Sequence, residues 1–438
     1  MEESKKPSQT ENKYCIIGAG PAGMSGAKAL KEAGIDFDGF ELGVDFGGLW
    51  NIDNPQSTIY ESAHLISSRT TTEFKDFPMP EGTPDYPGQA LMRRYFVDYA
   101  KHFGLYPHYY FNTKVLTVEK AGQQWKVTIQ TKGETPQTLI YKGVIIANGT
   151  LSEPNRPSFA GNFSGEIMHS SEYKKASIFH NKRVLVIGAG NSGCDIVVDA
   201  VHHAKKVDIS VRRGYYFVPK YIFGKPSDTV GGKIKLPRPI KQLIDTKLLR
   251  WFTGNPVDFG FPDPAYKIYE SHPVVNTLIL HHIGQGDVKV QHDIDQMEGN
   301  TVHFKDGTKQ EYDLIVLATG YKLHFPFIDK KYLNWQDLSP ELYLNIFHPQ
   351  DDNLFVLGMV EATGLGWEGR YEQARLMARF IKGTAQKTAA AKRFKQKKAN
   401  GNPDLSGGYK YLKLARMSYY VHKETYRNLV CKEAEKMK

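Results

Sequence analysis

Two glycine-rich stretches carry the residues of this sequence that are best suited to bind a reactive group. They read G-A-G-P-A-G at 18–23 and G-A-G-N-S-G at 188–193, and each follows a short apolar run. Glycines at this spacing permit a tight strand-to-helix turn and a close approach of the backbone to a pyrophosphate, which then lies at the helix N-terminus. Both stretches therefore predict dinucleotide-binding units, in which the bound nucleotide supplies the chemistry.

The residue that follows the second strand of each unit indicates which nucleotide the unit binds. Glu41 lies 18 residues after Gly23, which is about the place of the acid that binds a ribose hydroxyl. In the second unit Arg212 and Arg213 occupy that place, and guanidinium groups pair bidentately with a 2′-phosphate. The first unit is therefore predicted to bind an adenine dinucleotide through an acid, and the second is predicted to bind NADPH.

The same order of elements occurs twice in the chain. Gly18 lies 129 positions before Ala147, in A-N-G, and Gly188 lies 130 positions before Ala318, in A-T-G-Y. Similar beginnings and ends at almost the same spacing are typical of related halves. We therefore expect an α/β fold with two Rossmann-like domains that bind different nucleotides.

Hydrophobic periodicity predicts the elements around these motifs. Single strands are expected at 14–17, 313–321 and 353–358, and a series of strands is expected within 112–149. The expected helices lie at 24–33, 88–103 and 370–381. The expected core face of the second helix carries Leu91, Tyr95, Phe96, Tyr99 and Phe103. Asp306-Gly307 predicts a hairpin turn. The segment 215–286 is longer than a simple connection, which predicts either a cover over the active site or a helical insertion that packs on the second domain.

Composition limits the class of protein. A chain of 438 residues with 40% hydrophobic and 24% charged residues is typical of a globular protein of two or three domains. It contains no signal peptide and no run of 18 apolar residues, so we expect a cytoplasmic protein without a membrane span. Cys15, Cys194 and Cys431 lie far apart without a C-x-x-C pair, which argues against a redox dithiol or a thiolate zinc site.

The charged and histidine-rich stretches receive structural interpretations. The net charge of +10 suits an enzyme for anionic cofactors and equally describes a basic solvated surface. The basic run 392–398 is interpreted as a solvated helix face or tail, and no nucleic-acid partner is expected. His281 and His282 are interpreted as surface or packing residues, because no further ligand follows at metal-binding spacing, and no metal site is expected.

The ordered motifs resemble those of the flavin-containing monooxygenases in their compact bacterial form. The matching stretches are G-A-G-P-A-G (18–23), G-G-L-W (47–50), F-S-G-E-I-M-H-S-S-E-Y (163–173), G-A-G-N-S-G (188–193) and L-A-T-G-Y (317–321). The third stretch fits the family fingerprint F-x-G-x-x-x-H-x-x-x-Y or F through Phe163, Gly165, His169 and Tyr173. Related Baeyer–Villiger enzymes carry Trp at the last position, where this chain has Tyr. The resemblance extends from about residue 14 to residue 381.

The resemblance implies FAD in the first half and NADPH in the second, with both domains of the three-layer ββα type and the NADPH domain inserted in the FAD domain. The expected FAD contacts are Gly18, Gly20, Pro21, Ala22, Gly23, Glu41, Gly48, Leu49, Trp50, His64, Val115 and Gln373. The expected NADP contacts are Gly188, Gly190, Asn191, Ser192, Gly193, Arg212, Arg213, Thr319, Gly320 and Tyr321. His169 is expected to serve a domain junction rather than catalysis.

The activity implied is that of an NADPH-dependent FAD monooxygenase. Such an enzyme uses a flavin C4a-(hydro)peroxide to oxygenate soft nucleophiles, and forms N-oxides from amines or sulfoxides from thioethers. Many relatives carry an Asn before the D-F-P segment that is thought to touch cofactor and bound oxygen; here the position is Ile66, followed by Ser67 and Ser68, and these three are the pocket candidates. The missing Asn leaves open an uncoupled NADPH oxidase that produces hydrogen peroxide. Baeyer–Villiger oxidation of ketones and a non-catalytic flavin or NADP sensor are further alternatives.

The predicted domain order follows from these motifs. It runs through a polar tail (1–13), a first part of the FAD domain (14–175), the NADPH domain (176–325, with the insertion 215–286), a second part of the FAD domain (326–385) and a basic C-terminal extension (386–438). The last residues, K-E-A-E-K-M-K, lack the apolar anchor of membrane-bound animal members. The expected partners are a small-molecule substrate and dioxygen, and a homodimer is left open.

Overall fold

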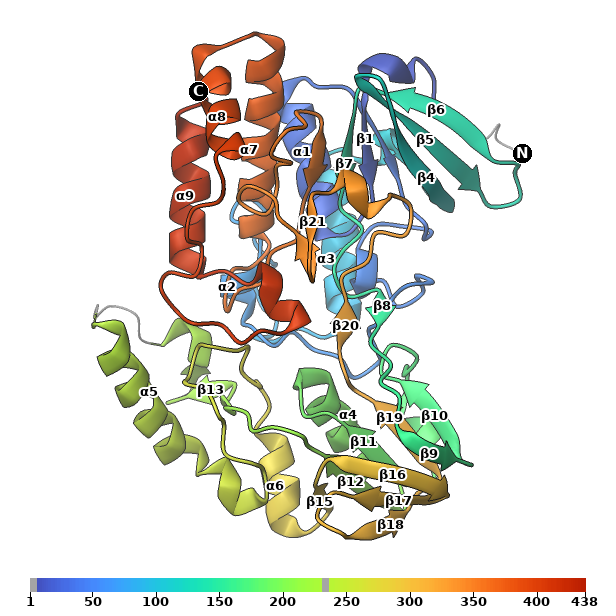
Figure 1. Cartoon of the computed structure of the whole chain (residues 1–438), viewed down its shortest axis with the longest axis vertical. Coiled ribbons are helices and arrows are strands. Elements are labelled where there is room, and N and C mark those ends of the chain that lie inside the picture. The colour runs from blue at the N-terminus through green and yellow to red at the C-terminus, as the bar shows by residue number, and fades with distance from the viewer. Residues whose placement is uncertain (1–5, 231–235) are drawn as a thin grey trace. The chain divides into compact units, whose positions relative to one another are not determined.

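The computed structural model describes residues 6–230 and 236–438, and these fall into two compact units (Figure 1). Unit 1 comprises Met1–Ser57, Arg69–Ser152 and Leu323–Lys438. Unit 2 comprises Thr58–Ser68 and Glu153–Lys322. Unit 2 therefore interrupts unit 1 in the sequence, as the predicted insertion of one domain in the other requires.

Within the described residues, unit 1 is built on a five-stranded parallel sheet in the order β23-β7-β1-β2-β3. The strands are β1 (Tyr14–Ile17), β2 (Phe37–Phe40), β3 (Tyr109–Tyr110), β7 (Gly143–Ile146) and β23 (Leu354–Val356). The helices are α1 (Pro21–Ala33), α2 (Arg69–Thr72), α3 (Gln89–His102), α7 (Glu368–Ala385), α8 (Ala389–Ala399) and α9 (Lys423–Glu435). The hairpin β21 (Trp335–Gln336) and β22 (Ser339–Pro340) completes the unit.

An antiparallel sheet forms the third layer of unit 1. It consists of β4 (Thr113–Ala121), β5 (Gln124–Thr131) and β6 (Gln137–Tyr141) (Figure 1). Alternate residues of β4 and β5, such as Val118, Trp125 and Val127, pack in one apolar cluster with Cys15 and Val144 of the parallel sheet. Residue alternation thus buries one face of the small sheet, as is typical of an antiparallel layer.

Unit 2 repeats this plan within the described residues. Its parallel sheet has the order β10-β19-β11-β12-β15, with β10 (Glu166–His169), β11 (Arg183–Ile187), β12 (Lys206–Ser210), β15 (Val288–Gln291) and β19 (Leu314–Leu317). The second sheet contains β9 (Ala160–Phe163), β16 (Ile294–Gly299), β17 (Thr301–Phe304) and β18 (Lys309–Glu311). The remaining elements are α4 (Asn191–Val201), α5 (Arg238–Thr253), α6 (Leu278–Gln285), β8 (Glu153–Pro154), β13 (Tyr221–Ile222), β14 (Lys225–Pro226) and β20 (Tyr321–Lys322).

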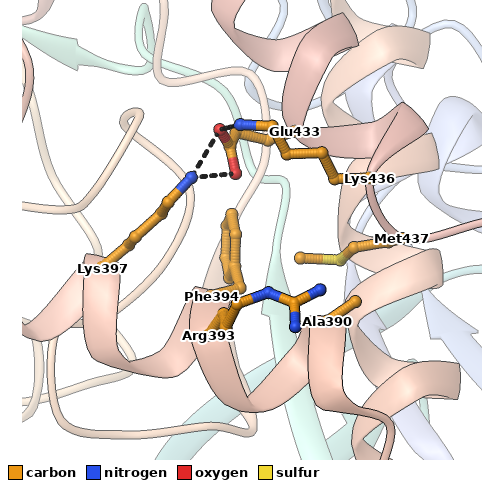
Figure 2. A pocket seen from close by; sticks show the side chains of 7 residues that line it. All are labelled: Ala390, Arg393, Phe394, Lys397, Glu433, Lys436 and Met437. Carbon is orange, nitrogen blue, oxygen red and sulfur yellow. Dashed lines mark hydrogen bonds and ion pairs between the residues drawn. The ribbon is translucent and has the colours of Figure 1, made fainter.

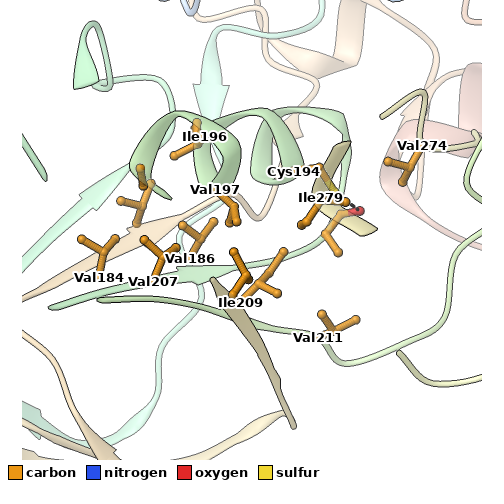
Figure 3. Close-up of a cluster of buried hydrophobic side chains, with 14 of the residues drawn as sticks. Val184, Val186, Cys194, Ile196, Val197, Val207, Ile209, Val211, Val274 and Ile279 are labelled. Atoms are coloured by element: carbon orange, nitrogen blue, oxygen red, sulfur yellow. Dashed lines mark hydrogen bonds between the residues drawn. The ribbon is translucent and has the colours of Figure 1, made fainter. Parts of the chain in front are cut away.

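The core of unit 2 explains why these sequences form strands and helices. Val184 and Val186 of β11 and Val207 and Ile209 of β12 face Ile196 and Val197 of α4 (Figure 3). The branched side chains favour strands, and burial removes their apolar surface from water. Leu185, Ile187, Ile315 and Leu317 point to the other face and pack with Met297, Val302 and Phe304 of the second sheet.

A buried acid occurs at the same place in both units. Asp38 of β2 accepts a hydrogen bond from the Tyr141 hydroxyl at 3.0 Å, and Asp208 of β12 accepts one from the Tyr312 hydroxyl at 2.6 Å. Each acid lies two residues before the end of the second strand. Each tyrosine lies two residues before the strand that pairs with the first strand of its unit, which is β7 beside β1 and β19 beside β11. The internal repeat predicted from the glycine motifs is therefore present in the packing.

Several elements differ in detail from the sequence expectation. α1 begins at Pro21 rather than at residue 24, because proline fits the first helical turn, and α7 spans Glu368–Ala385 rather than 370–381. In α3 the core position expected for Leu91 was wrong: Leu91 is 45% exposed, while its neighbour Met92 is fully buried. Met92, Tyr95, Phe96 and Tyr99 define the buried stripe, so Leu91 lies at its edge.

The second unit begins earlier than residue 176. It includes residues 153–175, because β10 pairs in parallel with β19 and so forms the edge of its sheet. The segment Thr58–Ser68 also belongs to it. In the insertion 215–286, α6 packs its Ile279 and Leu280 into the core beside α4, as a helical insertion on this unit requires. The hairpin expected at Asp306-Gly307 joins β17 to β18.

The basic C-terminal extension is part of unit 1 rather than a solvated tail. Phe394 of α8 is 1% exposed and packs against Phe347 and Phe380. Lys398 of α8 is also 1% exposed, and its ammonium donates to the carbonyls of His348, Pro349 and Asp351 at 2.7, 2.9 and 3.1 Å. No helix in the described part of the chain is both long and apolar enough to cross a membrane.

We expect Lys398→Met to destabilise unit 1, because three carbonyl acceptors would lose the buried ammonium that donates to them. The free energy of unfolding should fall by about 2 kcal/mol. Lys392→Met, an exposed lysine of the same helix, is the matched control and should change it by less than about 0.5 kcal/mol. Urea denaturation followed by circular dichroism measures both, and equal effects of the two substitutions would contradict the assigned role of Lys398.

Candidate functional site

The first glycine turn brings backbone segments together that leave no room for side chains. Gly18 has a φ of +109°, and a Cβ atom there would lie 2.6 Å from the Ala147 carbonyl oxygen. A Cβ at Gly23 would lie 1.9 Å from the Gly18 oxygen, and one at Gly48 would lie 2.8 Å from the Gly20 Cα. These contacts place the first motif against both the end of β7 and the G-G-L-W segment. The motif therefore lies at the carboxyl edge of the sheet, where parallel α/β folds bind ligands.

Glu41 is fixed in front of this turn. Its carboxylate accepts the Ala19 N–H at 2.6 Å through Oε2 and the Gly43 N–H at 2.7 Å through Oε1. Burial raises the pKa of the Glu41 carboxyl, and the Gly43 and Ala19 N–H groups act against this shift. Each carboxylate oxygen has a second lone pair, so the group can still accept ribose hydroxyls.

The other expected FAD contacts fall into two groups. Pro21 and Ala22 start α1, and Leu49 and Trp50 are half-buried in the short helix Gly48–Trp50, so they stay with the turn. The Val115 side chain packs between the two sheets, which leaves its backbone as the part that could touch a nucleotide. His64 lies in unit 2, exposed, with Nδ1 2.8 Å from the Ser62 oxygen.

Gln373 differs most from its expected role. The side chain is fully buried; Oε1 accepts the Gly358 N–H at 3.1 Å and Nε2 donates to the Tyr426 hydroxyl at 2.5 Å. Its amide is therefore engaged at both ends.

Asn54, which the sequence reasoning missed, donates to the Gly48 oxygen at 2.9 Å and so holds the G-G-L-W segment. Its place four residues after Trp50 gives no motif that would have revealed it.

The second glycine turn has the same geometry as the first. Gly188 has a φ of +104°, and a Cβ atom there would lie 2.6 Å from the Ala318 oxygen. A Cβ at Gly193 would lie 2.0 Å from the Gly188 oxygen, whereas the space beside Gly190 is open. Ser192 is half-buried in the first turn of α4. Asn191 donates to the Pro273 oxygen at 3.2 Å and accepts the Val275 N–H at 2.7 Å, so it ties the insertion to the helix start.

The two arginines after β12 differ in their surroundings. Arg212 is exposed and forms no ion pair or hydrogen bond with another described residue. Arg213 is half-buried; its guanidinium lies 5.3 Å from the centre of the Tyr215 ring and donates to the Tyr215 hydroxyl at 3.3 Å. Arg212 is therefore the more available partner for a phosphate.

The segment after β19 is held by hydrogen bonds within unit 2. The Thr319 hydroxyl donates to the Asn155 oxygen at 2.5 Å, and β20, which begins with Tyr321, pairs with β8. His169 Nε2 lies 3.1 Å from the Gly320 oxygen. Because the Ser171 N–H donates to His169 Nδ1 at 3.1 Å, the proton of the neutral ring lies on Nε2 and is donated to Gly320.

The residues of the predicted fingerprint are buried or tightly packed, and they hold neighbouring backbone segments in place. His169 is fully buried, and burial lowers its pKa below the ordinary 6.5. A Cβ at Gly165 would lie 2.6 Å from the Phe163 ring and 2.7 Å from the Asp313 oxygen, so only glycine fits. Tyr173 is fully buried, stacks on Phe179 and donates to Asp199 at 2.7 Å.

The pocket candidates Ile66, Ser67 and Ser68 lie in the segment of unit 2 that begins at Thr58. The Ser68 N–H donates to Asp228 of the insertion at 2.7 Å. Tyr60, in the same segment, donates to Asp195 of α4 at 3.1 Å, and Ser62 donates to Asp199, one helical turn further along. These acids were missed from the sequence; their signal is a four-residue spacing on the helix that follows the second glycine motif.

A cavity of about 290 Å³ lies elsewhere in unit 1, between α8 and α9 (Figure 2). It is lined by Ala390, Arg393, Phe394, Lys397, Glu433, Lys436 and Met437. Lys397 and Lys436 both pair with Glu433, at 2.9 and 2.7 Å. None of the expected site residues lines this cavity, and a space of this size is below the usual range for a ligand as large as a dinucleotide.

His169→Gln should make stability less dependent on pH. Because the folded state disfavours the charged imidazole, the stabilisation by His169 is complete above about pH 6.5 and is lost as the pH falls through the lowered pKa. Glutamine can donate to the Gly320 oxygen but does not titrate, so its melting temperature should fall less between pH 7.5 and 5.5. His180→Gln, an exposed histidine of the same unit, is the control. A His169→Gln protein with the wild-type pH dependence would contradict this assignment.

Comparison with known proteins agrees with this geometry. The family model described as flavin-binding monooxygenase-like matches residues 11–425. Mouse flavin-containing monooxygenase 1 is 34% identical over 397 residues, which cover 85% of this chain and 74% of the relative. The structure of S-allyl-L-cysteine S-oxygenase from Allium sativum shares the fold with a TM-score of 0.67 at 21% identity, over 97% of this chain and 89% of the other. For ε-caprolactone-bound cyclohexanone monooxygenase the TM-score is 0.71 at 18% identity, over 97% of each chain. The chain belongs to the flavin-binding monooxygenase-like family.

Proposed function

We propose that this protein is an NADPH-dependent FAD monooxygenase that oxygenates soft nitrogen or sulfur nucleophiles. The observation that carries the proposal is the pair of equivalent glycine turns in one chain, of which the first faces a carboxylate and the second is followed by arginines. Two turns of the same shape with opposite charge suit two different dinucleotides. Membership of the flavin-binding monooxygenase-like family supports the assignment of a flavin to one of them.

FAD is assigned to unit 1 and NADPH to unit 2. Glu41, held by two backbone N–H groups, presents its remaining lone pairs to the ribose, and the N-terminus of α1 receives the pyrophosphate. In unit 2, the start of α4 receives the NADPH pyrophosphate and Arg212 pairs with the 2′-phosphate. When bound, FAD accepts hydride from NADPH and activates dioxygen.

The residues of this chain bind the cofactors and exclude water; they do not transfer protons. The histidine of the fingerprint is neutral, buried and already donates to Gly320, which leaves it no free proton to transfer. Ile66, in the segment Thr58–Ser68, is apolar at the position where many relatives carry a polar Asn. An apolar wall excludes water from reactive oxygen species, but it offers no hydrogen bond to them.

N- and S-oxygenation are preferred over ketone oxidation. One relative, at 33% identity, bears the name dimethylaniline monooxygenase (N-oxide-forming) 2, and the garlic neighbour is an S-oxygenase. The likeness to cyclohexanone monooxygenase concerns the fold, and the fingerprint ends in Tyr173 instead of tryptophan. Ile66 favours a second candidate, an NADPH oxidase that releases hydrogen peroxide.

One experiment separates these functions. Purified protein should carry FAD, and NADPH consumption should increase when a thioether or a tertiary amine is added, with sulfoxide or N-oxide formed. Peroxide equal to the NADPH consumed, whatever substrate is present, would establish the oxidase. A lactone from a cyclic ketone would establish Baeyer–Villiger activity. Protein that takes up no FAD would contradict the proposal as a whole.

Ile66→Asn should lower the share of NADPH that ends as peroxide, because an amide can donate a hydrogen bond to a bound oxygen species. We expect a decrease of about threefold, which corresponds to one modest hydrogen bond. Ile66→Val keeps the position apolar and should leave the share unchanged. Peroxide and oxygenated product are measured together against NADPH; a decrease with valine as well would assign the effect to side-chain volume.

Arg212→Gln should weaken the binding of NADPH and leave the binding of NADH almost unchanged. Loss of a charged hydrogen bond to the 2′-phosphate should raise the NADPH Michaelis constant about tenfold or more. Arg213→Gln is the comparison, and a smaller effect is expected because Tyr215 already holds Arg213. Steady-state kinetics with both cofactors provide the measurement. An equal loss for NADPH and NADH would mean that Arg212 does not contact the phosphate.

A further inference from the structure

The turn that follows β23 lies against the flavin-binding motif of unit 1. Gly358 has a φ of +83°, and a Cβ atom there would lie 2.7 Å from the Cβ of Ala22. Ala22 lies in the first turn of α1, at the helix N-terminus where the pyrophosphate is expected. The Leu357 N–H donates to the Ile146 oxygen of β7 at 2.8 Å, so the turn starts at the carboxyl edge of the sheet. A shift of this turn would therefore move atoms at the edge of the FAD site.

A series of buried hydrogen bonds, here called the relay, connects the turn at Gly358 to Tyr426 of α9. The Gly358 N–H donates to Gln373 Oε1 at 3.1 Å, Gln373 Nε2 donates to the Tyr426 hydroxyl at 2.5 Å, and that hydroxyl donates to the Leu344 oxygen at 2.7 Å. Gln373 and Leu344 are fully buried and Tyr426 is 1% exposed. Burial raises the pKa of Tyr426, so its hydroxyl keeps the proton that it donates to Leu344. The direction of each donor also determines which end of the Gln373 amide faces Gly358.

The relay ends at a strained turn, which forms hydrogen bonds to the C-terminal extension (386–438). Leu344 and Asn345 have φ values of +55° and +57°, which is uncommon for residues with a side chain. Asn402 Oδ1 accepts the Leu344 N–H at 3.0 Å, and Asn345 Nδ2 donates to the Tyr419 oxygen at 3.4 Å. Such a conformation persists where the surroundings determine it. Here the surroundings are residues of the C-terminal extension.

The far end of the Gly358 turn is also held by the extension. The Glu361 N–H donates to the Tyr419 oxygen at 3.3 Å, and the Val421 N–H donates to the Glu361 oxygen at 2.8 Å. Arg416 Nη2 donates to Glu361 Oε2 at 2.9 Å. The turn 358–361 is thus attached to the sheet at its start and to the extension through both Gln373 and Glu361.

We propose that Tyr426 is a positioning residue for FAD, which acts through Gln373 to hold the turn 358–361 against the first glycine motif. The basic C-terminal extension, to which the sequence assigned no role in the site, is then a working part of the flavin site. This inference rests on the proposed function, because it requires FAD in unit 1. It also explains why Gln373 belongs to the site although neither end of its amide is available to a cofactor.

Tyr426→Phe tests the proposal, because it removes the hydroxyl and keeps the ring. FAD affinity is measured by titrating apoprotein with FAD and following flavin fluorescence, at a temperature where circular dichroism shows the variant folded. The FAD dissociation constant should rise about tenfold, the equivalent of one buried hydrogen bond of about 1.4 kcal/mol. With FAD saturating, the NADPH Michaelis constant should stay within twofold, a split that general destabilisation would not produce.

Tyr343→Phe is the matched control. Tyr343 is 8% exposed and packs on Phe394, beside the same strained turn, but its hydroxyl has no hydrogen bond within the described residues. Its FAD dissociation constant should equal that of the wild type. A double-mutant cycle of Tyr426→Phe with Gln373→Leu adds a second criterion: effects on FAD affinity that are far from additive support the relay.

The outcomes are separable. If wild-type apoprotein binds no FAD, the proposed function fails. If the wild type binds FAD and Tyr426→Phe binds it equally well, or if the two substitutions are additive, the positioning role is overturned. Should Tyr426→Phe fail to fold, Arg416→Gln replaces it, since Arg416 is a partly exposed side chain that holds the other end of the turn. It should raise the FAD dissociation constant about threefold, and an unchanged constant would overturn the proposal.

Discussion

The close contact between a glycine turn and the end of a neighbouring strand is the constraint on which both units depend. Gly18 meets the Ala147 oxygen and Gly188 meets the Ala318 oxygen at distances that exclude any Cβ atom. This contact brings the start of the following helix to the carboxyl edge of the sheet. A single methyl group at either glycine would push apart the surface that a pyrophosphate needs.

The same backbone plan then accepts different charges without changing shape. Asp38 with Tyr141 and Asp208 with Tyr312 maintain the same buried hydrogen bond in the two sheets. After the second strand, however, unit 1 presents the Glu41 carboxylate and unit 2 presents the guanidinium of Arg212. In the proposed function, the choice of nucleotide depends on these side chains at the edge of each sheet.

Polar side chains inside the units serve mainly to hold loops in place. His169 donates to the Gly320 oxygen, and Gln373 accepts the Gly358 N–H. Lys398 donates to three carbonyl oxygens of the segment 348–351. Each is buried and satisfied, which is the condition under which a buried polar group stabilises one conformation. An enzyme whose chemistry belongs to its cofactors needs this accuracy of loop placement more than it needs proton donors.

The sequence alone determined the features that depend on local spacing. The two glycine turns, the acid after one strand, the arginines after the other and the repeat itself are all patterns within about thirty consecutive residues or between equal patterns. The tertiary structure decided which side chains meet. That Gln373 braces Gly358 from Tyr426, that Met92 rather than Leu91 enters the core, and that residues 153–175 join the second sheet depend on partners far away in the chain. Local periodicity carries no information on such partners, because a hydrogen bond between distant residues leaves no regular spacing in the sequence.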